Sequence, residues 1–203
     1  MESDLALLER WRAGDRGAGN QLLARHFADL RTYFVLRLAA EHEDLVQETF
    51  WQLLRGLHRF RAESSFRTYL FHIARNVLAG AFRKKYRVEI DPISDSLADL
   101  TGEGHSSLLA ERERLRLLLD SLRALTLDNQ DLLELYYFQR LTARELGGLF
   151  EASEGAIRGR IRTALGHLRT TYFKLAALPH EREIDEDLLE KWLIELREEI
   201  RRS

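Results

Sequence analysis

The chain of 203 residues carries 31 Lys and Arg against 33 Asp and Glu, a formal net charge of −2, and contains two prolines and no cysteine. Without cysteine there is no disulfide and no thiolate metal site, and no run of about 18 apolar residues suggests a membrane span. The charged, leucine-containing N-terminus does not fit a signal peptide, so we expect a cytoplasmic protein without membrane insertion. Abundant Leu, Arg, Glu and Ala favour an all-α fold.

The charges are strongly segregated along the chain. Residues 55–87 hold nine basic side chains against the single acid Glu63, and residues 158–174 hold five bases and no acid. Between them, residues 88–113 hold seven acids and one base. Two basic segments therefore lie far apart in sequence. The acidic residues between them offset their positive charge, so the net charge of the whole chain does not reveal them. The seven histidines lack HxxxH or HExxH spacing, so we expect no metal and no cofactor.

Apolar residues at three- and four-residue intervals over 5–11 and 22–38 predict two short helices, separated by a break at Gly14, Gly17 and Gly19. Residues 45–57 predict an amphipathic helix. Its polar side holds Asp44, Gln47, Glu48, Trp51, Gln52 and Arg55. Trp51 is either a partly buried boundary residue or an anchor for a partner, because tryptophan is enriched in interface hot spots.

A polar loop over 59–65 precedes a long predicted helix, 66–87, that Ser65 can cap. Aromatic residues lie close to its cations, a combination that suits single-stranded nucleic acid. The alternative is that the terminal cations only complement the helix dipole. Residues 88–107, with Pro92, Gly102 and Gly104, predict a linker between two domains.

Two helices are predicted over 108–125 and around 132–138, and a helix-turn-helix follows them. Thr142-Ala-Arg-Glu145 is a capping box that begins a short helix to about Phe150. After a turn at Glu151 and Ala152, Ser153 can cap a basic helix. An ordinary helix pair with a solvated basic face is the alternative, but the absence of any acid over 155–174 favours DNA binding.

An amphipathic stripe beyond Pro179 predicts one further helix, in a segment (175–203) with nine acids and five bases. Its apolar members are Ile184, Leu188, Leu189, Trp192, Leu193, Leu196 and Ile200. This extension either packs on the second domain and stabilises it, or covers a DNA-binding or polymerase-binding face and inhibits the free protein.

The runs Asp44-Leu-Val-Gln-Glu-Thr-Phe50, Phe66-Arg-Thr-Tyr-Leu-Phe-His-Ile-Ala-Arg-Asn76 and Arg83-Lys-Lys85 resemble region two of extracytoplasmic-function sigma factors of the sigma-70 family. Residues 141–168 resemble their region-four helix-turn-helix. The resemblance covers about residues 5–87 and 112–172. The occurrence of both regions in the family's order is a more specific signal than either region alone. It implies two small helical domains joined by a flexible linker, with region two at 1–87, the linker at 88–111, region four at 112–174 and the extension at 175–203.

The resemblance implies a non-enzymatic factor that binds core RNA polymerase, directs it to specific promoters and assists promoter melting. The main alternative is a dimeric helix-turn-helix regulator that acts without polymerase, with Trp192 in a dimer seam. A third class is a DNA-processing enzyme such as a recombinase, which only Ser64 and Ser65 beside Arg61 and Arg67 suggest.

Site residues follow from the resemblance, position by position. Core polymerase, through its clamp coiled coil, would be bound by Asp44, Gln47, Glu48, Trp51 and Gln52. The minus-ten promoter element would be bound by Arg61, Ser65, Arg67, Arg75, Asn76, Arg83, Lys84 and Lys85. The minus-thirty-five element would be bound by Glu154, Arg158, Arg160 and Arg162.

Further expected partners are promoter DNA, the polymerase flap, and an anti-sigma factor unless the extension itself inhibits. The chain departs from the family pattern in the extension over 175–203 and in three further places. It has Glu151 where the recognition turn often holds glycine, Gly147 and Gly148 inside the short helix, and no proline in the turn over 126–131.

Overall fold

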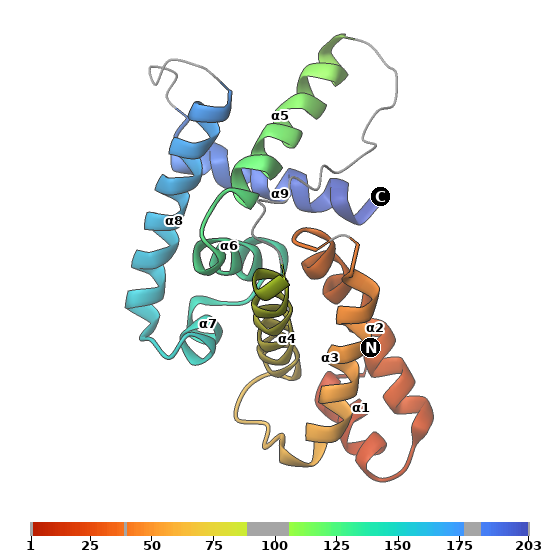
Figure 1. The fold of residues 1–203 in the computed structure, drawn as a ribbon. Coiled ribbons are helices and arrows are strands. Elements are labelled where there is room, and N and C mark those ends of the chain that lie inside the picture. The colour runs from red at the N-terminus through yellow and green to blue at the C-terminus, as the bar shows by residue number, and fades with distance from the viewer. Residues whose placement is uncertain (1, 39, 89–105, 177–183, 203) are drawn as a thin grey trace. The chain divides into compact units, whose positions relative to one another are not determined.

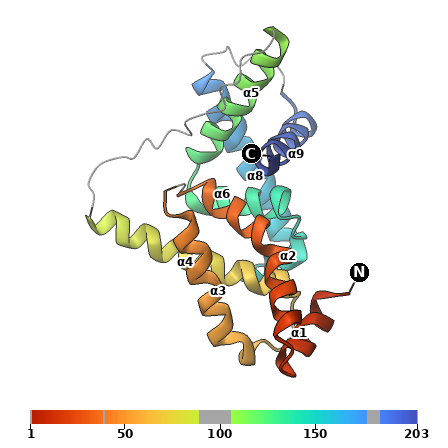
Figure 2. The same ribbon diagram turned by 90° about the vertical axis from the view of Figure 1, so that its right-hand side faces the viewer.

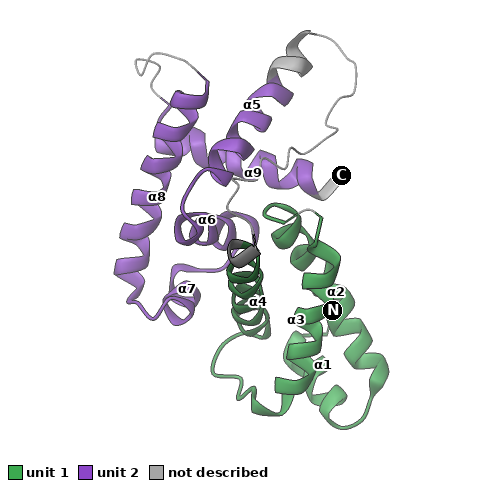
Figure 3. Cartoon of the chain, viewed as in Figure 1, with its two compact units in different colours: residues 1–94 green, residues 95–203 purple. Residues whose placement is uncertain are grey.

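The structure, a computed structural model, describes residues 2–38, 40–88, 106–176 and 184–202 (Figure 1). All regular elements in these ranges are helical, which confirms the predicted all-α class. The chain forms two compact units, residues 1–94 and 95–203 (Figure 3). Most of the predicted linker lies outside the described residues. Within the described ranges, none of the helices has both the length and the apolar character needed to cross a membrane.

Unit 1 is built from α1 (Asp4–Arg12), α2 (Arg16–Val35), α3 (His42–Gly56), the short 3₁₀-helix η1 (Leu57–Arg59) and α4 (Phe66–Val88). The helix α2 packs against α1, α3 and α4, as Figure 1 and Figure 2 both show. Aromatic rings fill the centre of the unit, where Tyr33 contacts Phe34 and Phe71 edge-on at 5.3 and 5.5 Å between centroids. This core fixes α3 and α4, the two helices that carry the predicted sites.

The break between α1 and α2 is shorter than predicted. The helix α1 ends at Arg12, and Asp15 caps α2 by accepting a hydrogen bond from the Ala18 N–H. Gly17 and Gly19 therefore lie inside α2, where a break was expected. At Gly19 a methyl group would lie 2.5 Å from the indole ring of Trp11. Glycine is needed there because α1 and α2 approach closely, and not because the chain must turn.

Unit 2 contains α5 (Ser106–Arg123), α6 (Leu127–Leu133), the π-helical turn η2 (Glu134–Phe138), α7 (Ala143–Leu149), α8 (Glu154–Leu175) and α9 (Glu186–Arg202). The helix α8 packs against α5, α6 and α7. Fully buried leucine and isoleucine side chains hold these helices together, among them Leu118, Leu122, Leu146 and Ile157. The predicted short helix, turn and basic helix are present as α7 and α8.

The second helix of this unit differs from the simple α-helix predicted around 132–138. After α6 the chain widens into η2, where the Gln139 N–H donates to the Glu134 carbonyl, five residues back, at 3.0 Å. Turns of this kind insert one residue and change which side chains share a face, which hydrophobic spacing alone cannot reveal. Two residues after the end of η2, Arg140 has a φ of 54°, which lies in the left-handed region.

The predicted C-terminal helix is present as α9, and its apolar stripe is buried on unit 2. Leu189, Leu193 and Leu196 are almost fully buried, while Leu188 is partly exposed. The helix contacts α5, η2 and α8. The structure therefore shows the packing on the second domain that one of the two interpretations of the sequence predicted.

Candidate functional site

The exposed side of α3 displays a compact set of polar side chains around one tryptophan. Asp44, Gln47 and Glu48 are exposed, whereas Leu45, Val46, Thr49 and Leu53 face the core. The Gln52 amide donates to Glu48 Oε1 at 2.7 Å. The five residues predicted to bind polymerase therefore share one helix face. Because the opposite side of α3 is buried, this face is the one that α3 can offer to a partner.

Trp51 sits at the middle of this face, 51% exposed, with the Arg55 guanidinium 4.4 Å from its ring centroid. Sequence reasoning missed two exposed apolar neighbours. Phe27 of α2 stacks on Phe50 at 6.4 Å between centroids, and Leu54 is half exposed. An apolar spacing at 50 and 54 looks like core in a sequence, so only the fold reveals that part of this stripe reaches solvent.

The loop between η1 and α4 is held at its first residues by side chains from two helices. Arg12 at the end of α1 donates hydrogen bonds to the Leu57 and Phe60 carbonyls at 2.7 and 2.5 Å. The Phe60 ring is buried against Tyr69 at 4.8 Å between centroids. Ser65 accepts from the Thr68 N–H at 3.1 Å, so it caps α4 as predicted. The part of the loop between these anchors, including Arg61, is exposed.

The predicted minus-ten residues on α4 fall on different sides of the helix. Asn76 and Arg83, seven residues or two turns apart, are both exposed on one side. Arg67 lies on another side, where it donates to Asp29 Oδ2 at 2.8 Å and ties α4 to α2. Near the C-terminal end, Lys84 is exposed and Lys85 lies 3.6 Å from Glu41. Arg75 is half-buried. The structure thus brings only some of these residues to a common surface.

The turn between α7 and α8 depends on one of the unexpected glycines. Thr142 and Glu145 form the full capping box, and Ser153 caps α8 through the Ala156 N–H at 3.2 Å. A methyl group on Gly147 would lie 2.7 Å from the Ala152 carbonyl oxygen, which is backbone and cannot rotate away. The Ala152 N–H also donates to the Gly147 carbonyl at 2.9 Å. Gly147 is therefore required by the close approach of turn and helix.

Glu151 occupies the turn in a left-handed conformation, with φ of 51°. Side chains with a Cβ are strained there, so Glu151→Gly is expected to raise the free energy of unfolding by about 1 kcal/mol. Glu151→Ala, which removes the carboxylate and keeps the strain, serves as the control and should leave stability nearly unchanged. Urea unfolding of the three full-length chains measures this. Equal stabilities for the glycine and alanine variants would show that strain at this position is negligible.

The exposed face of α8 carries the predicted minus-thirty-five residues. Glu154, Arg158 and Arg162 follow one another at four-residue spacing, while Ile157 and Ile161 face the core. Glu154 accepts a hydrogen bond from Arg158 at 2.6 Å, and this bond raises the pKa of the Arg158 guanidinium above its ordinary value. Arg160 is also exposed, about half a turn away. The helix therefore presents cations on a broad outer surface.

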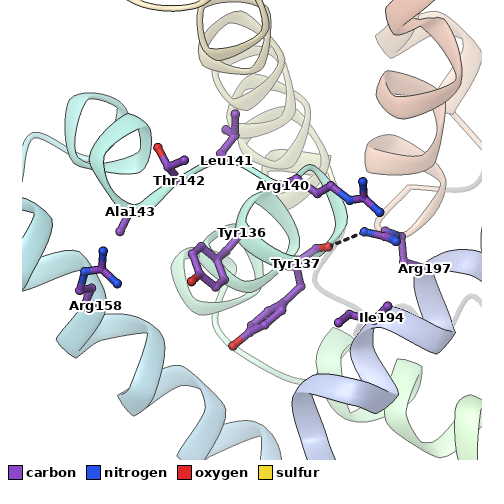
Figure 4. A pocket seen from close by; sticks show the side chains of 9 residues that line it. All are labelled: Tyr136, Tyr137, Arg140, Leu141, Thr142, Ala143, Arg158, Ile194 and Arg197. Carbon is purple, nitrogen blue, oxygen red and sulfur yellow. Dashed lines mark hydrogen bonds between the residues drawn. The ribbon is translucent and has the colours of Figure 1, made fainter. Parts of the chain in front are cut away.

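Beside this face, unit 2 has an open pocket of about 450 Å³ between η2, α8 and α9 (Figure 4). Arg140 from the segment between η2 and α7, Arg158 of α8 and Arg197 of α9 contribute side chains to it. Burial, and then a hydrogen bond to Glu190, raise the pKa of the nearby Tyr137 phenol far above its usual range. The phenol therefore stays protonated, and remains a hydrogen-bond donor, even in alkaline solution. Among the described residues no group of acidic or histidine side chains could hold a metal ion.

Two family models match the chain. Sigma-70 region 2 matches residues 23–88, and Sigma-70 region 4 matches residues 121–170. The ECF RNA polymerase sigma-E factor of Haemophilus influenzae is 29% identical over 173 residues, covering 78% of this chain and 89% of that protein. The sigma factor BldN of Streptomyces coelicolor is 28% identical over 76% of this chain and 60% of its own length.

Solved structures share the fold. The sigma factor RpoE of Bartonella quintana, in complex with the anti-sigma factor NepR, aligns with a TM-score of 0.58 and 20% identity over 75% of this chain and 94% of its own. CnrH, in complex with the cytosolic domain of CnrY, aligns with a TM-score of 0.59 and 22% identity over 83% of this chain and 96% of its own.

Proposed function

This chain belongs to the extracytoplasmic-function group of the sigma-70 family and is a sigma factor that directs RNA polymerase to promoters, and on that premise we propose a division of work between its two units. In this proposal residues 1–87 bind core polymerase and the minus-ten element. Residues 112–174 bind the minus-thirty-five element, and 88–111 connect them. The observation that carries the proposal is the pair of exposed, chemically different faces on α3 and α8.

The exposed face of α3 is the proposed docking surface for the clamp coiled coil of core polymerase. Asp44 and Glu48 supply negative charge, Gln47 and Gln52 supply hydrogen-bonding groups, and Trp51 supplies a large apolar surface. Charge complementarity steers and orients such an encounter, and a central tryptophan is typical of an interface hot spot. The neighbouring exposed Phe27 and Leu54 extend the apolar part of this surface.

The loop over 60–65 and the exposed side of α4 are the proposed site of minus-ten binding and promoter melting. Flipping a base out of the duplex costs a few kcal/mol, so the protein needs a fixed pocket wall and cations to offset it. Anchoring of the loop by Arg12 supports the first requirement. Exposed Arg61, Arg83 and Lys84 support the second, and Asn76 and the capping Ser65 add neutral hydrogen-bonding groups. We assign Arg67 a positioning role through Asp29, with Arg75 and Lys85 at the edge of the surface.

The helix α8 is the proposed reader of the minus-thirty-five element. In a helix-turn-helix the N-terminal residues of the second helix face base edges, and cations further along contact phosphates. Arg158 and Arg162 lie in one row with Glu154, and Arg160 lies to the side. We propose that this row enters the major groove and that Arg160 contacts the backbone.

We further propose that the polymerase flap and an anti-sigma factor are partners of this chain. The second rests on two neighbours, RpoE and CnrH, whose structures were solved with NepR and with the cytosolic domain of CnrY. In this proposal the chain performs no covalent chemistry. Ser64 and Ser65 are the two nucleophiles that the sequence suggested. The Ser64 hydroxyl donates to the Ser65 carbonyl at 3.4 Å, and the Ser65 hydroxyl caps α4 by accepting from the Thr68 N–H.

The test is reconstituted transcription by core RNA polymerase over a promoter library, with gel filtration of the mixture. The full chain should shift into the polymerase peak and select promoters with two elements. Arg158→Ala with Arg162→Ala should weaken binding to a selected promoter at least about tenfold, because base contacts are lost. Arg169→Ala, an exposed cation further along α8, is the control. A chain that binds duplex DNA but never co-elutes with polymerase would support the dimeric regulator.

A further inference from the structure

The C-terminal helix α9 is fixed on unit 2 in a single register. Trp192 is 8% exposed, with its ring 5.4 Å from Tyr172 of α8 and 4.9 Å from the Arg114 guanidinium of α5. Arg114 also pairs with Glu195 at 2.7 Å. An aromatic side chain buried between two helices, with an ion pair one turn away, fixes both the rotation of α9 about its own axis and its position along that axis.

A second group of contacts fastens α9 to η2. The Tyr137 hydroxyl donates to Glu190 Oε1 at 2.5 Å. The buried Arg197 guanidinium donates to the Tyr137 carbonyl at 3.3 Å (Figure 4). Tyr137 is thus held at both its side chain and its main chain by residues two turns apart on α9. This geometry also determines where the acids at the start of α9 lie.

Two of those acids lie beside the arginines of α8. Glu186 and Glu190 line a pocket of about 180 Å³ together with Arg158 and Arg162. Glu186 also acts electrostatically on the Tyr137 phenol, which belongs to the same pocket. The cations proposed to contact DNA are therefore flanked by carboxylates from a helix far along the chain. Asp187, the next acid of α9, is exposed and does not line this pocket.

We propose that docked α9 lowers the affinity of α8 for DNA because Glu186 and Glu190 place negative charge beside Arg158 and Arg162. Carboxylates at this position neutralise part of the field of the arginines and repel the phosphates that would approach them. The extension thus acts as an internal competitor for the DNA-binding face of unit 2. This inference rests on the proposed role of α8 in binding promoter DNA.

The experiment compares Glu186→Gln with Asp187→Asn in the full-length chain. The two changes remove the same charge from the first turn of the same helix, so their effects on net charge and on the helix dipole are matched. Binding to a fluorescent 30-base-pair duplex of mixed sequence is measured by anisotropy at low and high salt. Glu186→Gln should bind about threefold more tightly at low salt, and this gain should shrink as salt rises. Asp187→Asn should bind nearly as the parent does.

Equal gains for both variants would mean that only net charge matters, and no gain for Glu186→Gln would overturn the proposal directly. Thermal unfolding monitors folding, and both variants should melt with the parent because neither side chain is buried. The double variant Arg158→Ala with Arg162→Ala distinguishes a failure of the proposed role of α8 from a failure of the proposed role of α9. If it binds the duplex as well as the parent, the proposed role of α8 fails. If it binds weakly while Glu186→Gln shows no gain, only the role of α9 fails.

Discussion

Gly147→Ala is expected to lower the free energy of unfolding of unit 2 by about 1–3 kcal/mol, the usual range for forcing an extra carbon into a packed site. The new methyl group would meet the Ala152 carbonyl oxygen at 2.7 Å, and this oxygen belongs to the turn that sets the angle between α7 and α8. Relief requires the turn to move. Binding of duplex DNA through α8 should fall together with stability.

The neighbouring glycine is the matched control. Gly148 is exposed, with nothing within 4 Å of an added methyl group, so Gly148→Ala should stabilise α7 by up to about 1 kcal/mol through helix propensity. Amide hydrogen exchange in α7 and α8 measures both variants, with α1 to α4 as the internal reference. If the two alanines have the same effect, the close approach at Gly147 is not what the turn requires.

Asp44→Lys combined with Glu48→Lys is expected to weaken binding of core RNA polymerase by about 100-fold, within the range measured when charged contacts at an interface are lost or reversed. Both carboxylates lie on the exposed face of α3, so the substitutions should leave the core of unit 1 intact. Titration of fluorescent sigma factor with core polymerase measures the affinity. The loss should be smaller at high salt, where surface charges are screened.

Glu43→Lys controls for the helix itself. Glu43 is an exposed acid in the same first turn of α3, about 100° around the helix from Asp44 and at the edge of the predicted face, four residues before Gln47. Its reversal disturbs the helix dipole as much as that of Asp44 does, yet it should change polymerase affinity only a few-fold. A comparable loss in this control would mean that α3 contributes overall charge, and that its exposed face is not the docking surface.

The helical fold and the positions of most helices could be predicted because the signals that define each helix lie within or next to the helix itself. The capping residues Thr142 and Ser153 mark the starts of α7 and α8, and the apolar spacing of α9 predicts its buried side. Hydrophobic periodicity and side-chain caps depend on neighbours within a few residues, which a single sequence displays in full. The exposed polar row on α3 follows from the same periodicity.

Contacts between distant segments could not be predicted in this way. Arg67 resembles a DNA-binding cation in the sequence, but its guanidinium reaches Asp29, 38 residues earlier in the chain. Arg12 holds the loop carbonyls of Leu57 and Phe60, and no local pattern links these positions. The sequence predicts a helix break at Gly19. Its role in the structure is to make room for Trp11, and this depends on how two helices pack, which a local pattern does not show.

The placement of Trp192 gives the molecule an intrinsic optical signal. Its indole is buried between Tyr172 and Arg114, whereas the indole of Trp51 is half exposed on the other unit. Indoles shift their emission to longer wavelength when they become hydrated, so departure of α9 from unit 2 would change the colour of fluorescence without any attached dye. The rate at which this helix leaves and returns while the sigma factor meets DNA or polymerase can therefore be followed in a stopped-flow instrument on the unmodified chain.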